Sequence, residues 1–238
     1  AVRTEAAVST TWSTQYARAV GTTASRTDEH VVGVFQIDAA SAPAVGNITY
    51  IGAGTPTHGN YNVAVSPPLP SGITAGDLLV CFTHLRSNGT ITSTWTTHVS
   101  NNASVTFLLV SYRIATGSDT APTITPVGTT GGQHHTSCVL AFRGVDVATP
   151  FGTPGAITQI GSAEDLGPIA AATATQADGA VIVFGGRNDA TGGGITNPAL
   201  LTGDGLTWVE AVDAQSVDNA SHVVVNYAMW EGAAPTLT

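Results

Sequence analysis

The chain has 238 residues, a length that suits one large domain or two smaller ones. Charged residues make up only 10% of it, against about a quarter in an ordinary globular protein, and the net charge is −9. With no run of basic residues, the chain lacks the positive surface needed to hold nucleic acid. No apolar stretch approaches the roughly 20 residues of a membrane-spanning helix, so membrane insertion is not expected either.

Residues 1–29 form an N-terminal arm ahead of the first strongly β-like run. Val8-Ser-Thr-Thr-Trp12 echoes later parts of the chain weakly. We expect an arm that becomes ordered on a partner, or else a strand packed on its own subunit. A helix over residues 3–20, where Ala and Glu mix with Thr and Ser, is a further alternative.

The rest of the chain consists of short runs rich in Val, Ile, Thr, Tyr and Phe, separated by clusters of Gly, Pro, Asn and Asp. This pattern predicts an all-β fold. In the first part of the chain the predicted strands are residues 31–37, 47–52, 61–66, 77–85, 91–99, 105–114 and 122–126. In the second part they are residues 137–144, 156–160, 168–174, 179–185, 206–213, 222–230 and 235–238.

The two parts repeat one another in the same order. Ile48-Thr-Tyr-Ile-Gly52 recurs as Ile157-Thr-Gln-Ile-Gly161. Further matches are Val34-Phe35 with Ala141-Phe142, Asp77 with Asp178, Thr94-Trp95 with Thr207-Trp208, Val110-Ser-Tyr112 with Val225-Asn-Tyr227, and Pro122–Thr125 with Pro235–Thr238. The repeat predicts two tandem antiparallel β-sandwich units of jelly-roll or immunoglobulin-like type, residues 47–151 and 152–238.

The second unit lacks a closing strand, and its match lies at the other end of the chain, in residues 30–46. Because an open sheet edge exposes unpaired backbone groups, we expect a strand from this region to fill the gap. It could do so in its own chain, as a circular permutation, or in a neighbour, as donor-strand exchange. The predicted assembly residues are Val31, Val32, Val34, Phe35 and Ile37.

No catalytic, cofactor-binding or metal-binding residues are predicted. Cys81 and Cys138 are interpreted as small core residues, although a disulfide between them stays open. The His134-His135 pair is a poor metal site because neighbouring strand residues point to opposite faces. No Gly-x-Ser-x-Gly nucleophile motif occurs in the chain. The chain is therefore predicted not to be an enzyme.

The four tryptophans fall into two classes. Trp95 and Trp208 hold equivalent places in the repeat, which favours a framework role for both. Trp12 and Trp230 have no counterparts. If the chain has an exposed aromatic contact surface, these two are the candidates.

Several of these segments resemble the β-sandwich modules of tailed-bacteriophage virion proteins, which occur in tail fibres, minor tail proteins and head decorations. The segments are Gly76-Asp-Leu-Leu-Val80, Thr94-Trp95, Val110-Ser-Tyr112, Ala121-Pro-Thr-Ile-Thr125 and Ala141-Phe-Arg-Gly-Val-Asp146. The resemblance covers residues 47–238 and implies a structural or adhesive role without cofactors.

The resemblance implies a non-enzymatic virion structural protein on the outside of the phage, either a capsid decoration or a tail-surface subunit. Its partners would be other virion subunits, in a homo-oligomer or on a lattice, reached through the N-terminal arm or strand. The acidic, weakly charged surface suits an exterior location away from packaged DNA. The alternative is a glycan-binding or host-cell-binding adhesin module of a tail fibre or a secreted, extracellular protein, with a host-surface glycan as its partner.

Overall fold

The computed structural model describes fourteen stretches of the chain, and over these the protein is all-β, with strands, turns and bends and no helix. The described residues are 10–11, 15–17, 30–40, 47–60, 62–86, 89–103, 106–128, 134–152, 158–160, 166–169, 173–174, 178–187, 206–216 and 221–231. In this part of the chain no helix is long and apolar enough to cross a membrane.

The first large sheet has six antiparallel strands in the order β4-β11-β6-β9-β8, with β5 also paired to β11. Its strands are β4 (Thr49–Ala53), β5 (Thr57–Asn60), β6 (Leu78–Arg86), β8 (Thr96–Ala103), β9 (Thr106–Ile114) and β11 (His134–Arg143). A separate antiparallel pair is formed by β7 (Thr90–Ser93) and β10 (Ile124–Val127).

The second large sheet has five antiparallel strands in the order β12-β3-β15-β17-β16. Its strands are β3 (His30–Asp38), β12 (Thr158–Ile160), β15 (Gly179–Arg187), β16 (Trp208–Gln215) and β17 (His222–Trp230). Two short pairs complete the described strands, namely β1 (Thr10–Thr11) with β14 (Thr173–Ala174), and β2 (Gln15–Ala17) with β13 (Leu166–Ile169).

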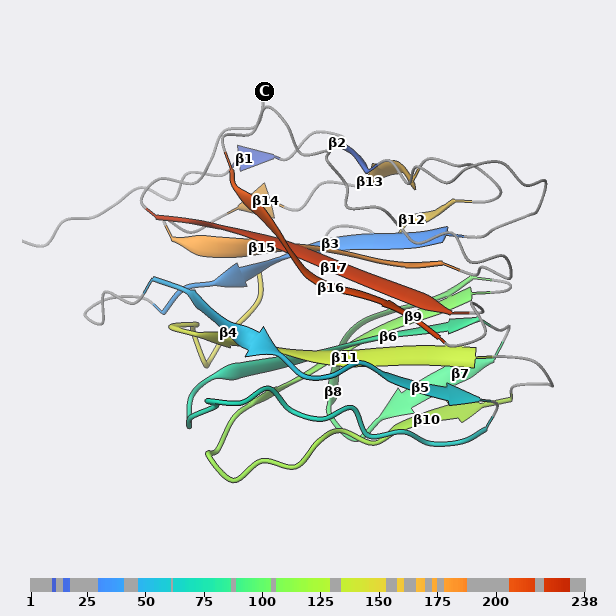
Figure 1. Cartoon of the computed structure of the whole chain (residues 1–238). Helices are drawn as coiled ribbons and strands as arrows, with labels where there is room; N and C mark the ends of the chain where they lie inside the picture. Colours follow the sequence, from blue (N-terminus) through green and yellow to red (C-terminus); the bar gives the residue numbers. More distant parts are fainter. Residues whose placement is uncertain are drawn as a thin grey trace, which may run out of the picture.

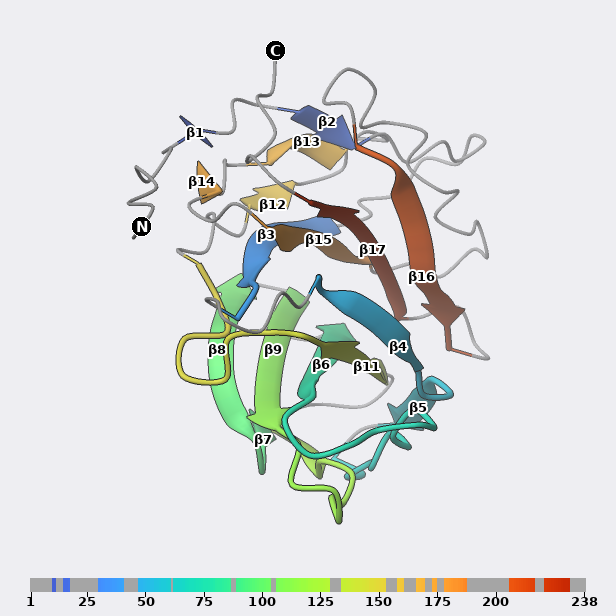
Figure 2. The ribbon, with the colours of Figure 1, turned by 90° about the vertical axis from the view of Figure 1, so that its left-hand side faces the viewer.

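The two large sheets lie one above the other (Figures 1 and 2) and contribute side chains to a single apolar cluster. Alternate residues of each strand point into it, as the two-residue period of a strand requires. From β6 these include Val80 and Phe82, and from β15 Ile182 and Phe184, all at most 1% exposed. The rings of Phe82 and Phe184, one from each sheet, have their centroids 5.4 Å apart.

The other face of the first sheet is also buried. Leu79 and Cys81 of β6 pack there with Ile91 of β7, Ile124 of β10 and Trp95. A strand that is covered on both faces reads as a continuous apolar run rather than as an alternating pattern. This explains the uninterrupted run Leu78-Leu-Val-Cys-Phe82, in which every residue is buried.

Most predicted strands match the structure within a few residues, and 222–230 coincides with β17. The prediction for residues 61–66 is wrong, because the strand there is β5 at 57–60, and Val65 makes only an isolated bridge to Ile124. The single strand predicted for 91–99 is two, β7 and β8. The helix alternative for 3–20 is wrong at residues 10–11 and 15–17, which are strands; residues 235–238 lie outside the described part.

The shared cluster bears on the predicted domain division. Residues from 47–151 and from 152–238 enter the same apolar cluster, as do Phe35 and Ile37 from the 30–46 region. The predicted units therefore share a core in this structure. Their boundaries stay a prediction.

Candidate functional site

Strand β3, the predicted assembly strand, is an interior strand of its own chain. It pairs along all nine of its residues with β15, from His30↔Arg187 to Asp38↔Gly179. Its other edge pairs with β12 and then with residues 150–152, where Asp38 N donates to the Pro150 carbonyl and Gly152 N to the Gln36 carbonyl. Of the two alternatives, this structure contains the pairing within one chain. Exchange with a neighbour stays a prediction.

Phe35 and Ile37, two of the five predicted assembly residues, are fully buried in the cluster between the sheets. The Phe35 ring contacts groups from both sheets. Its centroid lies 6.0 Å from that of Phe82, 5.5 Å from Phe184 and 5.3 Å from Phe151. The other three, Val31, Val32 and Val34, have paired backbones, and their side chains lie outside the described part of the structure.

The C-terminal end of β3 carries a buried carboxylate. Asp38 is 6% exposed, and its Oδ1 accepts a hydrogen bond of 2.6 Å from the amide of Gln36. Burial raises the pKa of Asp38 to about 6; the Gln36 hydrogen bond opposes this rise, and the nearby Asp146 carboxylate adds to it. At this end of β3, the Asp38 carboxylate is therefore held by the neutral amide of Gln36 and lies near the like charge of Asp146.

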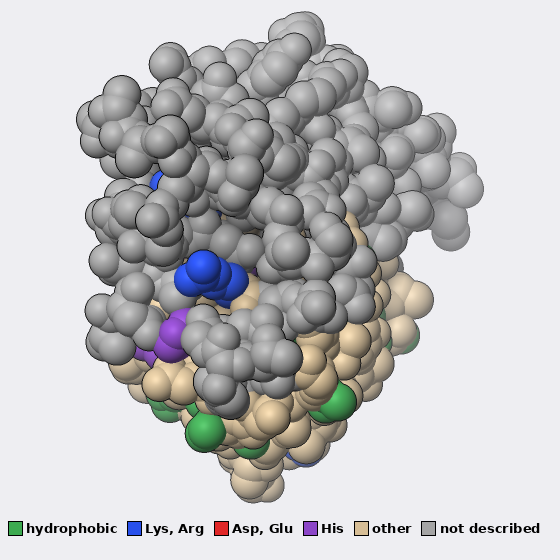
Figure 3. All heavy atoms as spheres, turned by 90° about the vertical axis from the view of Figure 1, so that its right-hand side faces the viewer, with side chains coloured by type: hydrophobic (Ala, Val, Ile, Leu, Met, Phe, Trp, Pro, Cys, Tyr) green, Lys and Arg blue, Asp and Glu red, His purple; other side chains and the backbone are tan. Residues whose placement is uncertain are grey.

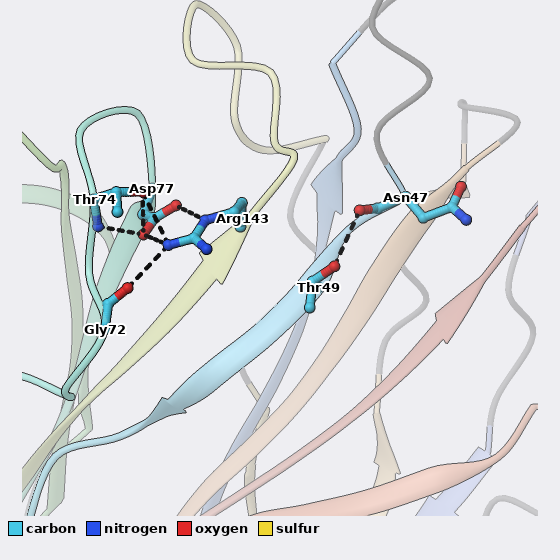
Figure 4. A network of polar contacts seen from close by, with 6 residues as sticks. All are labelled: Asn47, Thr49, Gly72, Thr74, Asp77 and Arg143. Atoms are coloured by element: carbon cyan, nitrogen blue, oxygen red, sulfur yellow. Dashed lines mark hydrogen bonds and ion pairs between the residues drawn. The ribbon is translucent and has the colours of Figure 1, made fainter.

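The corresponding end of β11 is locked by an ion pair (Figure 4). Arg143, its last residue, donates from Nε and Nη2 to the two carboxylate oxygens of Asp77, at 2.8 Å each. The same Nη2 also contacts the Gly72 carbonyl, and Thr74 N donates to Asp77 Oδ2. Burial acts to raise the pKa of Asp77, but the bonds from Arg143 and Thr74 outweigh it and hold the pKa below its usual value. Such a two-pronged pair fixes geometry as well as charge.

Histidines from separate strands meet at one end of the molecule. The sequence did not indicate that they form a group. Thr136 of β11 pairs with His58 of β5 on one side and with His84 of β6 on the other. His134 is paired with Asn60, and its Nδ1 lies 2.9 Å from the Asn60 side-chain oxygen. Figure 3 faces this end and shows histidine beside Lys or Arg side chains. Only strand register brings these residues together, so no local sequence signal could have found the group.

His84 joins the two sheets through hydroxyl groups. Its Nδ1 lies 2.9 Å from Ser221 Oγ and its Nε2 2.7 Å from Thr106 Oγ1. Ser221 Oγ donates to the His84 carbonyl, and Thr136 Oγ1 donates to the Ser221 carbonyl. Because the Ser221 hydroxyl proton is directed at a carbonyl, His84 donates to Ser221 rather than taking its proton. All four side chains are fully buried, so this network fastens the sheets rather than presenting a nucleophile.

Close packing of His84 accounts for a glycine in the opposite sheet. A β-carbon at Gly186 of β15 would overlap the His84 ring. The ring therefore lies directly against the β15 backbone, at the same end as the Ser221 contact.

His135 points to the face opposite His134 and is fully buried, with neither ring nitrogen hydrogen-bonded. Its ring lies against Gly59, where a β-carbon would overlap it. Burial lowers the pKa of His135 to about 4, with smaller contributions from His134 and His58. The imidazole is thus neutral near neutral pH, because a buried charge without a partner is costly.

The two cysteines face opposite sides of the first sheet. Cys138 enters the cluster between the sheets, and Cys81 enters the cluster beneath β7 and β10. Both are buried free thiols, which confirms their interpretation as core residues and resolves the open question of a disulfide. Burial raises the pKa of Cys81 to about 12, so the group stays a thiol.

The exposed aromatic contact predicted at Trp230 is wrong. Trp230 is only 8% exposed and is paired with Gly179, where a β-carbon would overlap its ring. The missing side chain of Gly179 makes room for the indole. Trp12 lies outside the described residues. Trp95 is buried in the cluster beneath β7 and β10, as its framework role predicts.

Replacing Asp77 with asparagine keeps the side-chain shape but removes the charge that Arg143 binds. We expect the free energy of unfolding to fall by about 1 kcal/mol, because hydrogen bonds to charged groups contribute at least that much. Urea denaturation measures the change. Arg143→Lys keeps the charge without the planar pair of donors and should lose part of the same stability. Equal stability of the unsubstituted chain, Asp77→Asn and Arg143→Lys would contradict a stabilising role of the ion pair.

The contribution of His135 to stability should fall as the pH drops from about 6.5 to about 4, its ordinary and its folded pKa. His98, whose pKa burial also lowers to about 4, acts in the same direction, and Asp38, whose pKa is raised to about 6, acts in the opposite direction. In this window His135 binds a proton in the unfolded chain but not in the folded chain, so its contribution to the free energy of unfolding decreases, by at most about 3 kcal/mol. Above it, His135 is neutral in both states and its full contribution is present. His135→Phe should flatten the slope of the free energy of unfolding against pH, measured in denaturation series across this range. An unchanged slope in His135→Phe would contradict this assignment.

Among the described residues, no group of three or more His, Cys, Asp or Glu side chains is placed to hold a metal ion. Comparison with known proteins gives no match, since no family model, no curated protein and no solved structure is similar to the chain.

Proposed function

We propose that this chain is a non-enzymatic structural protein of a bacteriophage virion, displayed on the exterior as a capsid decoration or tail-surface subunit. We propose further that it consists of two copies of one β-unit, packed as a β-sandwich. The resemblance of its repeated segments to phage virion modules suggests the setting, and the pairing of the strands supports the architecture.

The strand orders support the repeat. The first sheet runs β4-β11-β6-β9-β8 and the second β12-β3-β15-β17-β16. Strands matched by the sequence repeat hold the same place in each order: β4 with β12, β6 with β15, and β9 with β17. Phe82 and Phe184, which the repeat aligns, face one another between the sheets.

One observation carries the structural role. Among the described residues, the strands within residues 10–38 pair with strands within residues 158–187, and the end of β3 also pairs with residues 150–152. The N-terminal segment therefore completes the second sheet. This is the architecture of strand complementation, in which main-chain hydrogen bonds supply affinity and alternating side chains supply specificity. A segment that completes a sheet in this way is suited to joining subunits.

β-bulges interrupt three edge strands of the large sheets and limit their pairing with other chains. A bulge interrupts the register at edge strand β8 between Thr97 and Val99, and at edge strand β16 between Glu210 and Val212. A third lies in edge strand β4, where Ile51 is the extra residue between Gly52, paired with Ala141, and Tyr50, paired with Phe142. Bulges twist an edge and limit its pairing with other chains. That property suits a subunit present in many copies on one surface.

The adhesin alternative draws less support. A glycan-binding adhesin would need exposed aromatic rings, but the candidate Trp230 is buried against Gly179. The structural role is therefore the reading that the described residues favour.

The test is to purify particles from a culture that expresses the gene and to quantify peptides of this chain by mass spectrometry across a density gradient. We expect the chain to band with the particles at a fixed ratio to the major capsid or tail protein. Treatment of intact particles with proteinase K should remove it, because it lies outside. Recovery only in the particle-free fraction would overturn the virion role, and binding of that soluble protein to a glycan array would support the adhesin instead.

A further inference from the structure

We propose that copies of this chain assemble by exchanging their N-terminal segment, so that β3 of one copy completes the second sheet of another. The partner is a second copy of this chain. The inference rests on the proposed repeat and names the contact through which the proposed assembly would form.

The chain already exchanges strands between its own halves. After β3 the chain continues to β4 in the first sheet, although β3 itself lies in the second sheet. After β11 it continues to β12 in the second sheet, although β11 lies in the first. If the chain is divided before β3 and before β11, each half contributes its leading strand to the sheet of the other half, and the fold has the connectivity of a strand-swapped dimer joined into one chain.

The two connections cross at one place and pair with each other. Ala39 forms an antiparallel bridge with Val145. Next to it, Ala40 N donates to the Gly144 carbonyl at 3.0 Å, and Asp146 N donates to the Asp38 carbonyl at 2.9 Å. If β3 came from a second copy, the same crossing contacts could form between chains. Exchange of an identical element keeps the native contacts, which makes it a low-cost route to a dimer.

Strand β3, rather than β11, is the element that can leave. The segment before it contains only β1 and β2 among the described strands, and these pair with β14 and β13 of the same half that receives β3. The whole segment can therefore move to another copy as a unit. β11 lies between two parts of the chain and pairs with three strands of its sheet, β4, β5 and β6.

The polar contacts at the C-terminal ends of β3 and β11 also indicate that β3 is the strand that can leave. Arg143 binds β11 to Asp77 through two hydrogen bonds of 2.8 Å. Asp38 of β3 accepts its hydrogen bond from the neutral Gln36 and lies near the like charge of Asp146. β3 is therefore the less firmly fastened of the two donated strands.

A strand that replaces β3 between β12 and β15 has to match the shape and register of β3 closely. Phe35 fills the space among Phe82, Phe151 and Phe184, and Ile37 enters the same cluster. Nine backbone pairs with β15 set the register, and a slip by one residue would turn both apolar side chains to the other face. The same segment of another copy meets these requirements without any change.

A disulfide trap tests the exchange in the full-length protein. Gln36 of β3 is paired with Val181 of β15, and both are buried. One chain carries Gln36→Cys and another Val181→Cys; the two are mixed at high concentration, warmed below the unfolding midpoint, cooled and oxidised. A covalent heterodimer, seen by non-reducing electrophoresis and light scattering, is the expected product, because it requires β3 of one chain in the sheet of the other.

Three controls keep the result interpretable. The double variant Gln36→Cys/Val181→Cys should give a cross-linked monomer when it is diluted, which shows that the geometry permits the bond. The unsubstituted chain, whose Cys81 and Cys138 are buried, gives the background. Asp38→Asn in both single-cysteine chains should lower the yield of heterodimer about threefold or more. It removes a buried charge near Asp146 that, in the Gln36→Cys chain, has also lost its hydrogen bond from Gln36.

A cross-linked monomer from the double variant, with no heterodimer from the mixture at any concentration, would overturn the exchange. The proposed virion role fails separately. A chain that never exchanges but bands with particles is displayed through another contact, whereas a chain that exchanges but is absent from particles assembles elsewhere.

Discussion

The insertion of β3 between β12 and β15 is the interaction on which the rest of the structure depends. It satisfies the backbone groups of two neighbours that would otherwise form open edges, and it places Phe35 at the centre of the aromatic contacts between the sheets. Without it, the second sheet would lose an interior strand and the shared cluster would lose two fully buried side chains. Both losses fall on the same strand, so the N-terminal segment and the C-terminal half are stable only together.

Polar contacts fasten the ends of the sheets while apolar contacts fill their centre. At one end Arg143 and Asp77 fix β11, and at the other His84 and Thr136 reach Ser221 across the gap between the sheets. Buried polar groups stabilise a fold only when their partners are in place, so these contacts favour one relative position of the two sheets. His135 is an exception, buried with neither ring nitrogen hydrogen-bonded, and Asp38 accepts a hydrogen bond from Gln36 but lies near the like charge of Asp146.

The structure contains the closed single chain, and the proposed exchange would use the same contacts between chains. Strand complementation is indifferent to whether the inserted strand is covalently joined to its sheet, because the hydrogen bonds and the buried side chains are the same in either case. In the proposed exchange, the protein concentration would decide between the two states. A protein displayed in many copies would experience a high local concentration, which favours exchange over closure.

The sequence alone determined the strand content, the position of most strands and the existence of a gap that residues 30–38 could fill. The strand content and positions are encoded locally, in apolar runs such as Leu78–Phe82, whereas the gap was inferred from the proposed repeat. The interpretation of Cys81 and Cys138 as core residues also came from the sequence, because a free cysteine behaves as a small hydrophobic residue.

Only the tertiary structure showed that residues 30–38 fill the gap within their own chain, that the sheets share one core, and that Trp230 is buried rather than exposed. It also decided that histidines from separate strands meet at one end. Each of these depends on strand register and on which faces pack together. Those are contacts between residues far apart in the chain, and the period of a single strand carries no information about the strand that will lie beside it.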